Sequence, residues 1–284
     1  METIVVTGTS SGFGRMLVHE LAKSGLYSVI AAMRNSTAQN NAIKKELEEL
    51  PGVKVVEMDV TSDEQVAKIT AQILEEFQSI DVLINNAGVF GGGLLEAHSI
   101  QQVHRLFEVN VYAPLRLMKA VLPSMRSRQD GLIITMSSML GFFSIPLNAV
   151  YSASKFALEG LVTGSYPELI QKGVESILVE PGSFPTELYQ KAGIKADLAG
   201  VTASYDGMAE QMTTYANVKV SEALKKHQPK PEEVVTKIIS LIAMEKGSRP
   251  LRNPIDQISG EAFSNQVAEE LNTLARKQMA AYGF

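Results

Sequence analysis

A tyrosine and a lysine four residues apart are the residues of this sequence best suited to proton chemistry. Tyr151 and Lys155 lie in the stretch Y-S-A-S-K, and Ser138, in T-M-S-S-M, precedes the tyrosine by thirteen residues. Residues i and i+4 share one face of a helix, so this spacing places a phenol beside an ammonium group. Because Y-x-x-x-K also occurs by chance on exposed helices, the pair needs support from other motifs.

The lysine would change the chemistry of the phenol. A free phenol has a pKa of about 10 and is a poor acid or base at neutral pH. Two charges ~4 Å apart interact by roughly 4 kcal/mol at an effective dielectric constant of about 20, which lowers a phenol pKa by about two to three units. The pair therefore predicts a tyrosine, Tyr151, that exchanges a proton near neutral pH.

A glycine-rich turn at the start of the chain predicts a phosphate site. The apolar run Ile4 to Val6 is typical of a buried strand, and a helical pattern begins near Arg15. Between them lie glycines spaced G-x-x-x-G-x-G, namely Gly8, Gly12 and Gly14. Glycines admit a close approach of the backbone to a pyrophosphate, and the helix start offers free N–H groups. The alternative is an ordinary glycine-rich loop.

Six motifs occur in the order and spacing typical of one enzyme family. They are T-G-T-S-S-G-F-G (residues 7–14), N-N-A-G (85–88), Asn110 in E-V-N-V, Ser138, Y-S-A-S-K and P-G-S-F-P-T (181–186). From about residue 2 to 190 the chain resembles the short-chain dehydrogenases/reductases. The stretch R-P-L-R at 249–252 resembles the branch of 17β-hydroxysteroid dehydrogenases and related carbonyl reductases.

The resemblance implies a role for each matched residue. The implied catalytic residues are Asn110, Ser138, Tyr151 and Lys155. The implied cofactor-binding residues are Gly8, Ser10, Ser11, Gly12, Phe13, Gly14, Arg34, Asp59, Val60, Asn86, Ala87, Gly88, Tyr151, Lys155, Pro181, Gly182, Phe184 and Thr186. Ser138 is preferred to its neighbour Ser137 because family spacing selects it.

Two of these roles have structural alternatives. Asn110 is expected to bend a long helix and hold a water linked to Lys155, and the alternative is a satisfied core amide. Asp59 is expected to help hold the adenine ring, but it could instead be a turn acid before a helix cap at Thr61.

Cofactor choice is expected to be decided after the second strand, V-I-A-A-M-R-N. Enzymes that prefer NAD normally have an acid there for the ribose 2′-OH. Here Met33 stands at that place and Arg34 follows it, so we expect NADP(H), with the guanidinium on the 2′-phosphate and help from Ser10, Asn35 and Ser36. The alternative is that Arg34 is a solvated surface charge.

Apolar residues near the catalytic positions predict a hydrophobic small-molecule substrate. The expected substrate residues are Ser138, Leu140, Phe142, Phe143, Leu147, Tyr151, Phe184 and Tyr189, although each apolar one could be core packing. The leading hypothesis is an NADPH-dependent reductase of hydrophobic ketones or aldehydes. The alternatives are an NAD(P)-linked secondary alcohol or hydroxysteroid dehydrogenase acting oxidatively and a non-catalytic nucleotide-binding sensor.

Composition excludes several other classes. The 284 residues carry a net charge of −5 and no basic block, so no nucleic-acid partner is expected. There is no cysteine, and the four histidines are scattered, so no thiol chemistry and no metal site is expected. Because the first strand starts near residue 2 and no apolar run is long enough for a span, we expect a cytoplasmic protein without a membrane segment.

Alternating strand and helix patterns predict a doubly wound α/β fold, that is, a Rossmann-type parallel sheet in a single domain. Expected strands cover 2–7, 27–33, 53–58, 80–85, 131–137 and 174–180, and expected helices cover 13–24, 38–50, 63–78, 99–125, 149–172 and 261–281. The resemblance adds a seventh strand near 248–252. T-S-D-E at 61–64 suggests a helix cap at Thr61.

We expect three parts within residues 1–284. Residues 1–186 form the cofactor-binding and catalytic core, 187–230 a substrate lid, and 231–284 the C-terminal helices and last strand. The family often associates as a homodimer or homotetramer through the helix that carries Tyr151. Pro167 should kink that helix, which leaves the association open.

Overall fold

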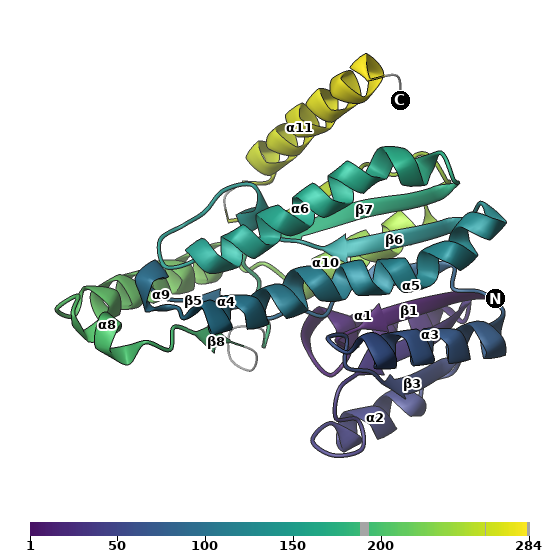
Figure 1. The fold of residues 1–284 in the computed structure, drawn as a ribbon, viewed down its shortest axis with the longest axis horizontal. Helices are drawn as coiled ribbons and strands as arrows, with labels where there is room; N and C mark the ends of the chain where they lie inside the picture. The colour runs from purple at the N-terminus through teal and green to yellow at the C-terminus, as the bar shows by residue number, and fades with distance from the viewer. Residues whose placement is uncertain (188–192, 259, 283–284) are drawn as a thin grey trace.

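A parallel seven-stranded sheet forms the centre of the molecule (Figure 1). The computed structural model describes residues 1–187, 193–258 and 260–282. In spatial order the strands are β3 (Val53–Glu57), β2 (Tyr27–Met33), β1 (Glu2–Thr7), β4 (Val82–Asn85), β6 (Gly131–Met136), β7 (Val174–Pro181) and β9 (Arg252–Ile255). This topology confirms the predicted doubly wound α/β class.

Helices cover both faces because the strands are apolar on both faces. On β1, Ile4 and Val6 point into one core and Val5 into the other. The first core is closed by α1 (Gly12–Ser24), α2 (Asn41–Glu48) and α10 (Pro231–Ala243). The second is closed by α3 (Asp63–Phe77), α5 (Ala113–Arg128) and α6 (Ala149–Ile170), which lie in front of the sheet in Figure 1.

The predicted helix at 99–125 is present, and a π-helical turn at Asn110 interrupts its regular hydrogen bonding. The helix consists of α4 (Ile100–Phe107), a π-helical turn η2 (Glu108–Tyr112) and α5. Asn110 lies in the π turn, where its side chain bonds to the backbone of a neighbouring loop. A π turn inserts one residue into a helix and commonly marks a functional site.

The start of the last strand and the cap of α3 also differ from their predicted positions. In each case a side chain forms hydrogen bonds with backbone groups nearby. The last strand begins at Arg252, because Arg249 instead donates to the carbonyls of Leu241 and Met244 at the end of α10. The cap of α3 is Ser62, whose hydroxyl accepts from the Gln65 N–H, because Asp59 has taken the N–H and hydroxyl of Thr61.

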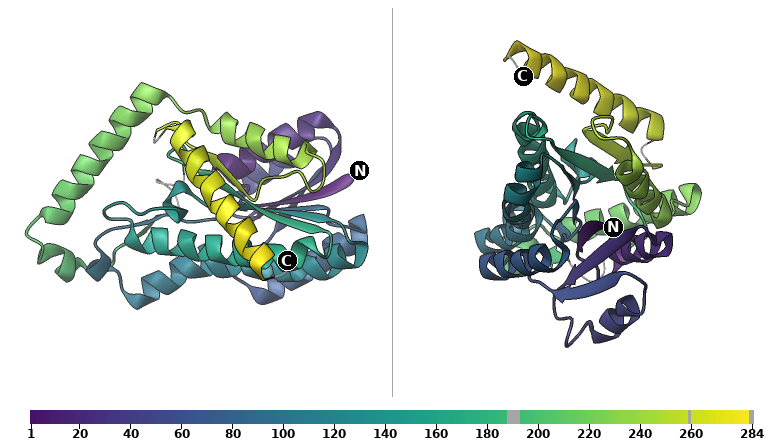
Figure 2. Two further views of the ribbon diagram at one scale, coloured as in Figure 1. Left: turned by 90° about the horizontal axis from the view of Figure 1, so that it is seen from above. Right: turned by 90° about the vertical axis from the view of Figure 1, so that its right-hand side faces the viewer.

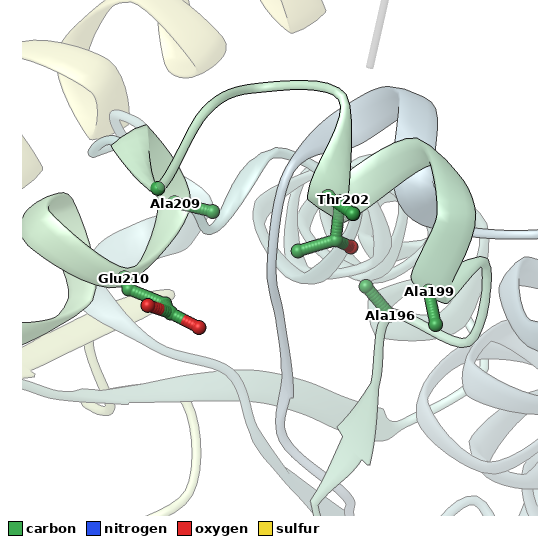
Figure 3. Close-up of a pocket in the computed structure, with 7 residues that line it drawn as sticks. Ala196, Ala199, Thr202, Ala209 and Glu210 are labelled. Carbon is green, nitrogen blue, oxygen red and sulfur yellow. The ribbon is translucent and has the colours of Figure 1, made fainter.

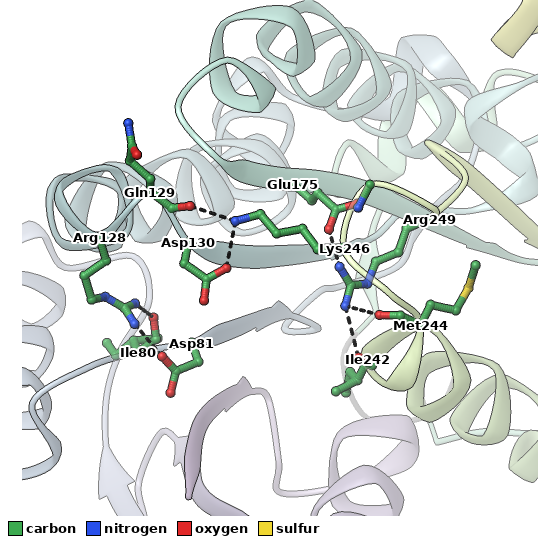
Figure 4. A network of polar contacts seen from close by, with 11 residues as sticks. Ile80, Asp81, Arg128, Gln129, Asp130, Glu175, Ile242, Met244, Lys246 and Arg249 are labelled. Carbon is green, nitrogen blue, oxygen red and sulfur yellow. Dashed lines mark hydrogen bonds and ion pairs between the residues drawn. The ribbon is translucent and has the colours of Figure 1, made fainter.

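Ion pairs tie the amino ends of the strands to the helices, at the edge opposite to the glycine-rich turn (Figure 4). Arg128 of α5 pairs with Asp81 before β4, and Lys246 pairs with Asp130 before β6. Arg249 pairs with Glu175 of β7, with side chains 9% and 2% exposed. These contacts join neighbouring segments at one edge of the sheet, and the functional loops lie at the other edge.

The segment from 193 to 230 lies outside the sheet. It contains β8 (Ile194–Lys195), which pairs with β5 (Gly91–Gly92), and the helices α8 (Ala199–Ala203) and α9 (Met208–His227). Within α9 only Ala209 is buried, and Figure 2 shows the helix extending away from the sheet. The final helix, α11 (Glu261–Ala281), has its predicted bounds and packs on β9.

Candidate active site

The candidate residues gather at the carboxyl ends of β1, β4, β6 and β7. In an open parallel sheet, ligands bind at this edge. The strands end at Thr7, Asn85, Met136 and Pro181, and the predicted motifs follow each end directly. The topology therefore brings together motifs that lie far apart in the sequence.

The turn after β1 and the loop after β4 brace each other. Gly8 has φ +71°, and a Cβ on it would lie 2.8 Å from the Ala87 Cα. A Cβ on Gly14 would lie 2.5 Å from the Asn86 Nδ2 and from the Gly8 carbonyl oxygen. The Asn86 Nδ2 also donates to the carbonyl of Thr7, at 2.8 Å. Side chains at either glycine would separate the two loops.

The start of α1 is suited to an anion. Ser11 is the N-cap residue, and its side chain makes no capping hydrogen bond, so the first N–H groups of the helix are not capped by it. Among the residues that the structure describes, a Cβ on Gly12 would meet only Thr186, at 4.0 Å, so these residues leave the space above the turn open. The uncapped helix start and the open glycine turn fit the pyrophosphate of a dinucleotide.

Tyr151 and Lys155 are buried side by side on the first and second turns of α6. Each residue is 6% exposed, and the Lys155 Nζ lies 5.8 Å from the centre of the tyrosine ring. The Nζ donates to the Met136 carbonyl, at 2.9 Å, which ties the lysine to the end of β6. Burial lowers the pKa of Lys155 to about 8, and the charge of Glu159 opposes this shift.

Ser138 begins the short turn η3 (Met139–Gly141) that follows β6. Its Oγ accepts a hydrogen bond from the Leu140 N–H, at 3.1 Å, and the residue is half-buried. The neighbouring Ser137 is 6% exposed and belongs to a different environment, near Glu159. Of the two serines, Ser138 is the more accessible.

Asn110 is a satisfied core amide in this structure. Its Oδ1 accepts from the Val89 N–H at 2.9 Å, and its Nδ2 donates to the Val89 carbonyl at 2.9 Å and to the Ser154 hydroxyl at 3.1 Å. These bonds connect the π turn to the loop after Gly88 and to α6. The expected water link from Asn110 to Lys155 stays a prediction.

The residues expected to select the cofactor, Met33 to Ser36 at the end of β2, have different surroundings from one another. Met33 is only 2% exposed and packs in the core, whereas Arg34 is exposed, and its guanidinium makes no hydrogen bond or ion pair within the described residues. The Ser36 hydroxyl donates to Glu57, at 2.8 Å, so it is committed to the protein. Ser10 is half-buried, and Asn35 has a positive φ of 52°.

Asp59 and Val60 have structural partners as well. The Asp59 Oδ1 accepts from the Thr61 N–H at 2.9 Å and from the Thr61 hydroxyl at 2.7 Å. Val60 is 6% exposed, and its carbonyl accepts from Arg116, at 3.0 Å. The turn-acid alternative for Asp59 is therefore present in the structure, while the adenine contact stays a prediction.

The loop after β7 lies against the last strand and α1. A Cβ on Gly182 would lie 2.3 Å from the Asp256 Oδ1, so only glycine fits there. Phe184 is 3% exposed and meets Phe13 edge to face, with 5.9 Å between ring centres. The structure thus places Phe184 in a packed aromatic pair.

The expected substrate residues lie unevenly around Tyr151. Leu140, Phe142 and Leu147 are half-buried and Phe143 is 36% exposed, whereas Tyr189 lies outside the described residues. Leu147 has a positive φ of 65°, and its carbonyl accepts from the Gly93 N–H at 2.8 Å. A positive φ in a residue other than glycine, as in Leu147, is a backbone strain that is typical of functional loops.

A cavity of about 380 Å³ lies farther out, between α8 and α9 (Figure 3). Its lining residues are Ala196, Ala199, Thr202, Ala203, Gly207, Ala209 and Glu210. None of the catalytic candidates lines it, so it is a feature of the outer segment.

A sequence profile described as short chain dehydrogenase matches residues 2–197. The chain belongs to the short-chain dehydrogenase/reductase family. Retinol dehydrogenase 8 of Bos taurus is 38% identical over 198 residues, which are 66% of this chain and 61% of that protein. Estradiol 17-beta-dehydrogenase 1 of Rattus norvegicus is 32% identical over 254 residues, 88% of this chain and 72% of that protein.

Solved structures agree with this assignment. A short-chain dehydrogenase from Streptomyces avermitilis superposes with a TM-score of 0.75 at 28% identity, covering 99% of this chain and 97% of that one. A metagenomic short-chain oxidoreductase in complex with NADP gives a TM-score of 0.68 at 25% identity, covering 90% and 96% of the two chains. The chain spans less than two thirds of the length of the bovine retinol dehydrogenase, at 61%.

Three residues near the site of this short-chain dehydrogenase escaped the sequence analysis. Phe90 packs against Tyr151, with 5.0 Å between ring centres and the two rings tilted by 53°. Its position two residues after N-N-A-G was the available signal. Glu57 holds the loop after Arg34, and Glu159 lies one turn beyond Lys155. Nothing in the local sequence distinguishes these two acids from surface residues.

Proposed function

We propose that this short-chain dehydrogenase is an NADPH-dependent reductase that converts a hydrophobic ketone or aldehyde into an alcohol. The observation that carries the proposal is the buried pair of Tyr151 and Lys155, with the Lys155 Nζ 5.8 Å from the tyrosine ring and Ser138 at the end of the adjacent strand. A buried cation beside a phenol is the arrangement that makes tyrosine a proton donor near neutral pH.

Each residue then has a defined task. Bound NADPH would supply a hydride to the carbonyl carbon of the substrate. Tyr151 donates its phenolic proton to the carbonyl oxygen, and Ser138 hydrogen-bonds that oxygen and orients it. With a pKa of about 8, Lys155 is mostly charged at neutral pH and stabilises the phenolate that remains on Tyr151.

The chain also offers groups to hold the cofactor. Gly8, Gly12 and the start of α1 would cradle the pyrophosphate. The backbone of Asn86, Ala87 and Gly88 would lie along the nucleotide. Pro181, Gly182 and Thr186 would seat the carboxamide, and Lys155 would bond the nicotinamide ribose.

Preference for NADPH is proposed from Arg34. Its exposed guanidinium is free to form a charge-assisted contact with a 2′-phosphate. The Glu57 carboxylate, which accepts from the Ser36 and Thr37 hydroxyls, lies at the end of the neighbouring strand and would oppose that phosphate. The NADP bound to the metagenomic relative supports the preference.

The hydrophobic substrate class is supported by the half-buried Leu140, Phe142 and Leu147 near Tyr151. The similarity to retinol dehydrogenase 8 and estradiol 17-beta-dehydrogenase 1 favours bulky apolar alcohols and carbonyls as substrates. Because those names describe dehydrogenases, oxidation of a secondary alcohol with NADP⁺ is the second candidate function.

Turnover assays separate these functions. We expect NADPH oxidation with a panel of bulky hydrophobic ketones and aldehydes, faster than NADH oxidation. Turnover of only the matching alcohols with NADP⁺ would favour the oxidative function. Cofactor binding without turnover of either panel would leave a nucleotide-binding sensor and contradict the proposal.

A further inference from the structure

A cluster of buried charged side chains lies behind the catalytic residues, where α6 meets β7 and β9. Glu159 of α6 and Arg252 of β9 have side chains only 7% and 10% exposed, and the Glu159 Oε2 lies 3.3 Å from the Arg252 Nε. A buried ion pair contributes little net stability, because removing both charges from water is costly. The proposed mechanism uses neither residue, so the pair needs another explanation.

Glu159 lies against two parts of the catalytic site. It follows Lys155 by one turn on α6, and its charge acts on the Lys155 ammonium. On another side it contacts the turn that begins at Ser138. A Cβ on Gly141 would lie 2.9 Å from the Glu159 Cγ and 3.0 Å from the Ser137 Oγ. Only glycine at that position leaves room for the carboxylate beneath the turn.

The charged groups around Glu159 determine its state. Lys155 faces it from α6, Arg252 from β9 and Glu180 from β7. Burial raises the pKa of Glu159, while the Ser137 hydroxyl and the two cations oppose that shift. Glu180 is fully buried, and burial together with the Glu159 charge raises its pKa well above the usual range. Because the Arg252 Nε lies 3.3 Å from the Glu159 carboxylate, whereas Glu180 is buried beside that same carboxylate, we assign the negative charge to Glu159 and the proton to Glu180.

We propose that Glu159 is a positioning residue for the reductase chemistry, acting through Lys155 and through the turn that carries Ser138. Its carboxylate, anchored by Arg252, keeps the lysine charged and holds the turn in place. The last strand thereby supports the proton donor although it contributes no residue that touches substrate. The inference rests on the proposed function.

The first test is the pH dependence of reduction in Glu159→Gln, which removes the charge and keeps the shape. Without the negative charge Lys155 loses its proton at lower pH, so the fall in kcat on the alkaline side should move down by about one pH unit. Near pH 8, kcat should fall about fivefold, because the charged fraction of Lys155 falls from about one half to about one eleventh when its pKa moves from about 8 to about 7. KM for ketone should change by less than about threefold. Glu159→Asp should restore part of the rate.

Glu175, at the opposite end of β7 from Glu180, offers a matched control for Glu159→Gln. Glu175 is 2% exposed and pairs with Arg249 (Figure 4). It lies near the amino end of β7, whereas the catalytic candidates lie at the carboxyl edge of the sheet. Glu175→Gln also neutralises a buried carboxylate in an ion pair with arginine, so it reproduces the structural cost. It should leave the pH profile of kcat unmoved. The same displacement in both variants would overturn the proposal.

A second measurement needs no turnover. NMR titration of the Lys155 side chain, assigned by comparison with Lys155→Met, should give a lower pKa in Glu159→Gln by about one unit and no change in Glu175→Gln. Equal Lys155 pKa values in the wild type and Glu159→Gln would refute the role of Glu159. A wild type that reduces no carbonyl would instead remove the proposed function, and the titration would still decide the coupling.

Discussion

Lys155 illustrates how burial alters a single residue. Its ammonium group is enclosed between α6 and the end of β6, and it donates to the Met136 carbonyl at 2.9 Å. Desolvation lowers its pKa to about 8, so a cation that would be inert on the surface becomes sensitive to small changes in its surroundings.

Tyr151→Phe should retain cofactor affinity and lose nearly all reduction. The ring still packs on Phe90, at 5.0 Å between centres, so the fold is preserved and only the proton donor is removed. A loss of about 10²- to 10⁴-fold in kcat is expected for a general acid. Steady-state kinetics with a ketone substrate checks this, and more than about a tenth of the wild-type rate in the variant would contradict the assignment.

Arg34→Ala should weaken NADPH binding and leave NADH nearly unchanged. Hydrogen bonds to charged groups contribute roughly 1.5–3 kcal/mol, or about ten- to 150-fold in affinity. Glu57→Gln should have the opposite effect, since it removes a negative charge from the neighbouring strand end. Dissociation constants for both cofactors, by fluorescence titration, check both variants.

The control for Arg34 is Arg126→Ala, an exposed arginine on α5. It should affect neither cofactor. An equal loss of NADPH and NADH affinity on Arg34→Ala would mean that this arginine supports the fold or the adenine, and the NADPH preference would fall with it.

At the scale of elements, the π turn η2 connects three parts of the site. It places Asn110 where one amide bonds the Val89 backbone and the Ser154 hydroxyl. The loop after β4, the α4–α5 helix and α6 are therefore held in one register. The outer elements are held less firmly, because α9 buries only Ala209 among its described residues.

Residues 193–230 should behave as a mobile lid over the substrate. Elements with little buried surface open at low free energy, so the amides of α9 should exchange much faster than those of β6 or α6. Hydrogen exchange with and without NADPH and a bound ketone measures this. Protection of α9 as strong as that of the sheet in the free protein would be incompatible with a lid.

At the scale of the whole molecule, the two edges of the sheet differ: one is joined by ion pairs and the other carries the candidate site. Its amino edge is closed by ion pairs such as Arg128 with Asp81, and its carboxyl edge carries the site. None of the helices in the part of the chain described here combines the length and apolar character needed to cross a bilayer. Large apolar side chains are exposed at the junction of η2 with α5 and on α6, namely Tyr112, Leu115 and Phe156, by 37% to 47%.

We expect this α5–α6 surface to form a homodimer contact. α6 continues past Pro167 to Ile170, and its outward Gly160 and Gly164 have no atom within 4 Å of a Cβ, so another helix could approach closely. Sedimentation equilibrium should show a dimer that Phe156→Glu dissociates. A matched exposed change, Phe263→Glu on α11, should not; a monomeric wild type would contradict the expectation.

The sequence by itself determined the family, the doubly wound fold and the set of motifs at the catalytic edge. These were predictable because local patterns carry them: apolar strands, glycine turns, and a Y-x-x-x-K spacing that one helix converts into proximity. Strands β1, β2 and β7 and helices α1, α6 and α11 accordingly lie within about three residues of their predicted bounds.

Only the tertiary structure decided which groups have partners. Ser36 is committed to Glu57, Met33 to the core and Asn110 to the Val89 backbone. The pairing of Glu159 with Arg252 joins α6 to the last strand across 93 positions of sequence, counted as 252 − 159. No local pattern encodes such contacts, because burial and charge pairing depend on elements that meet only when the sheet is assembled.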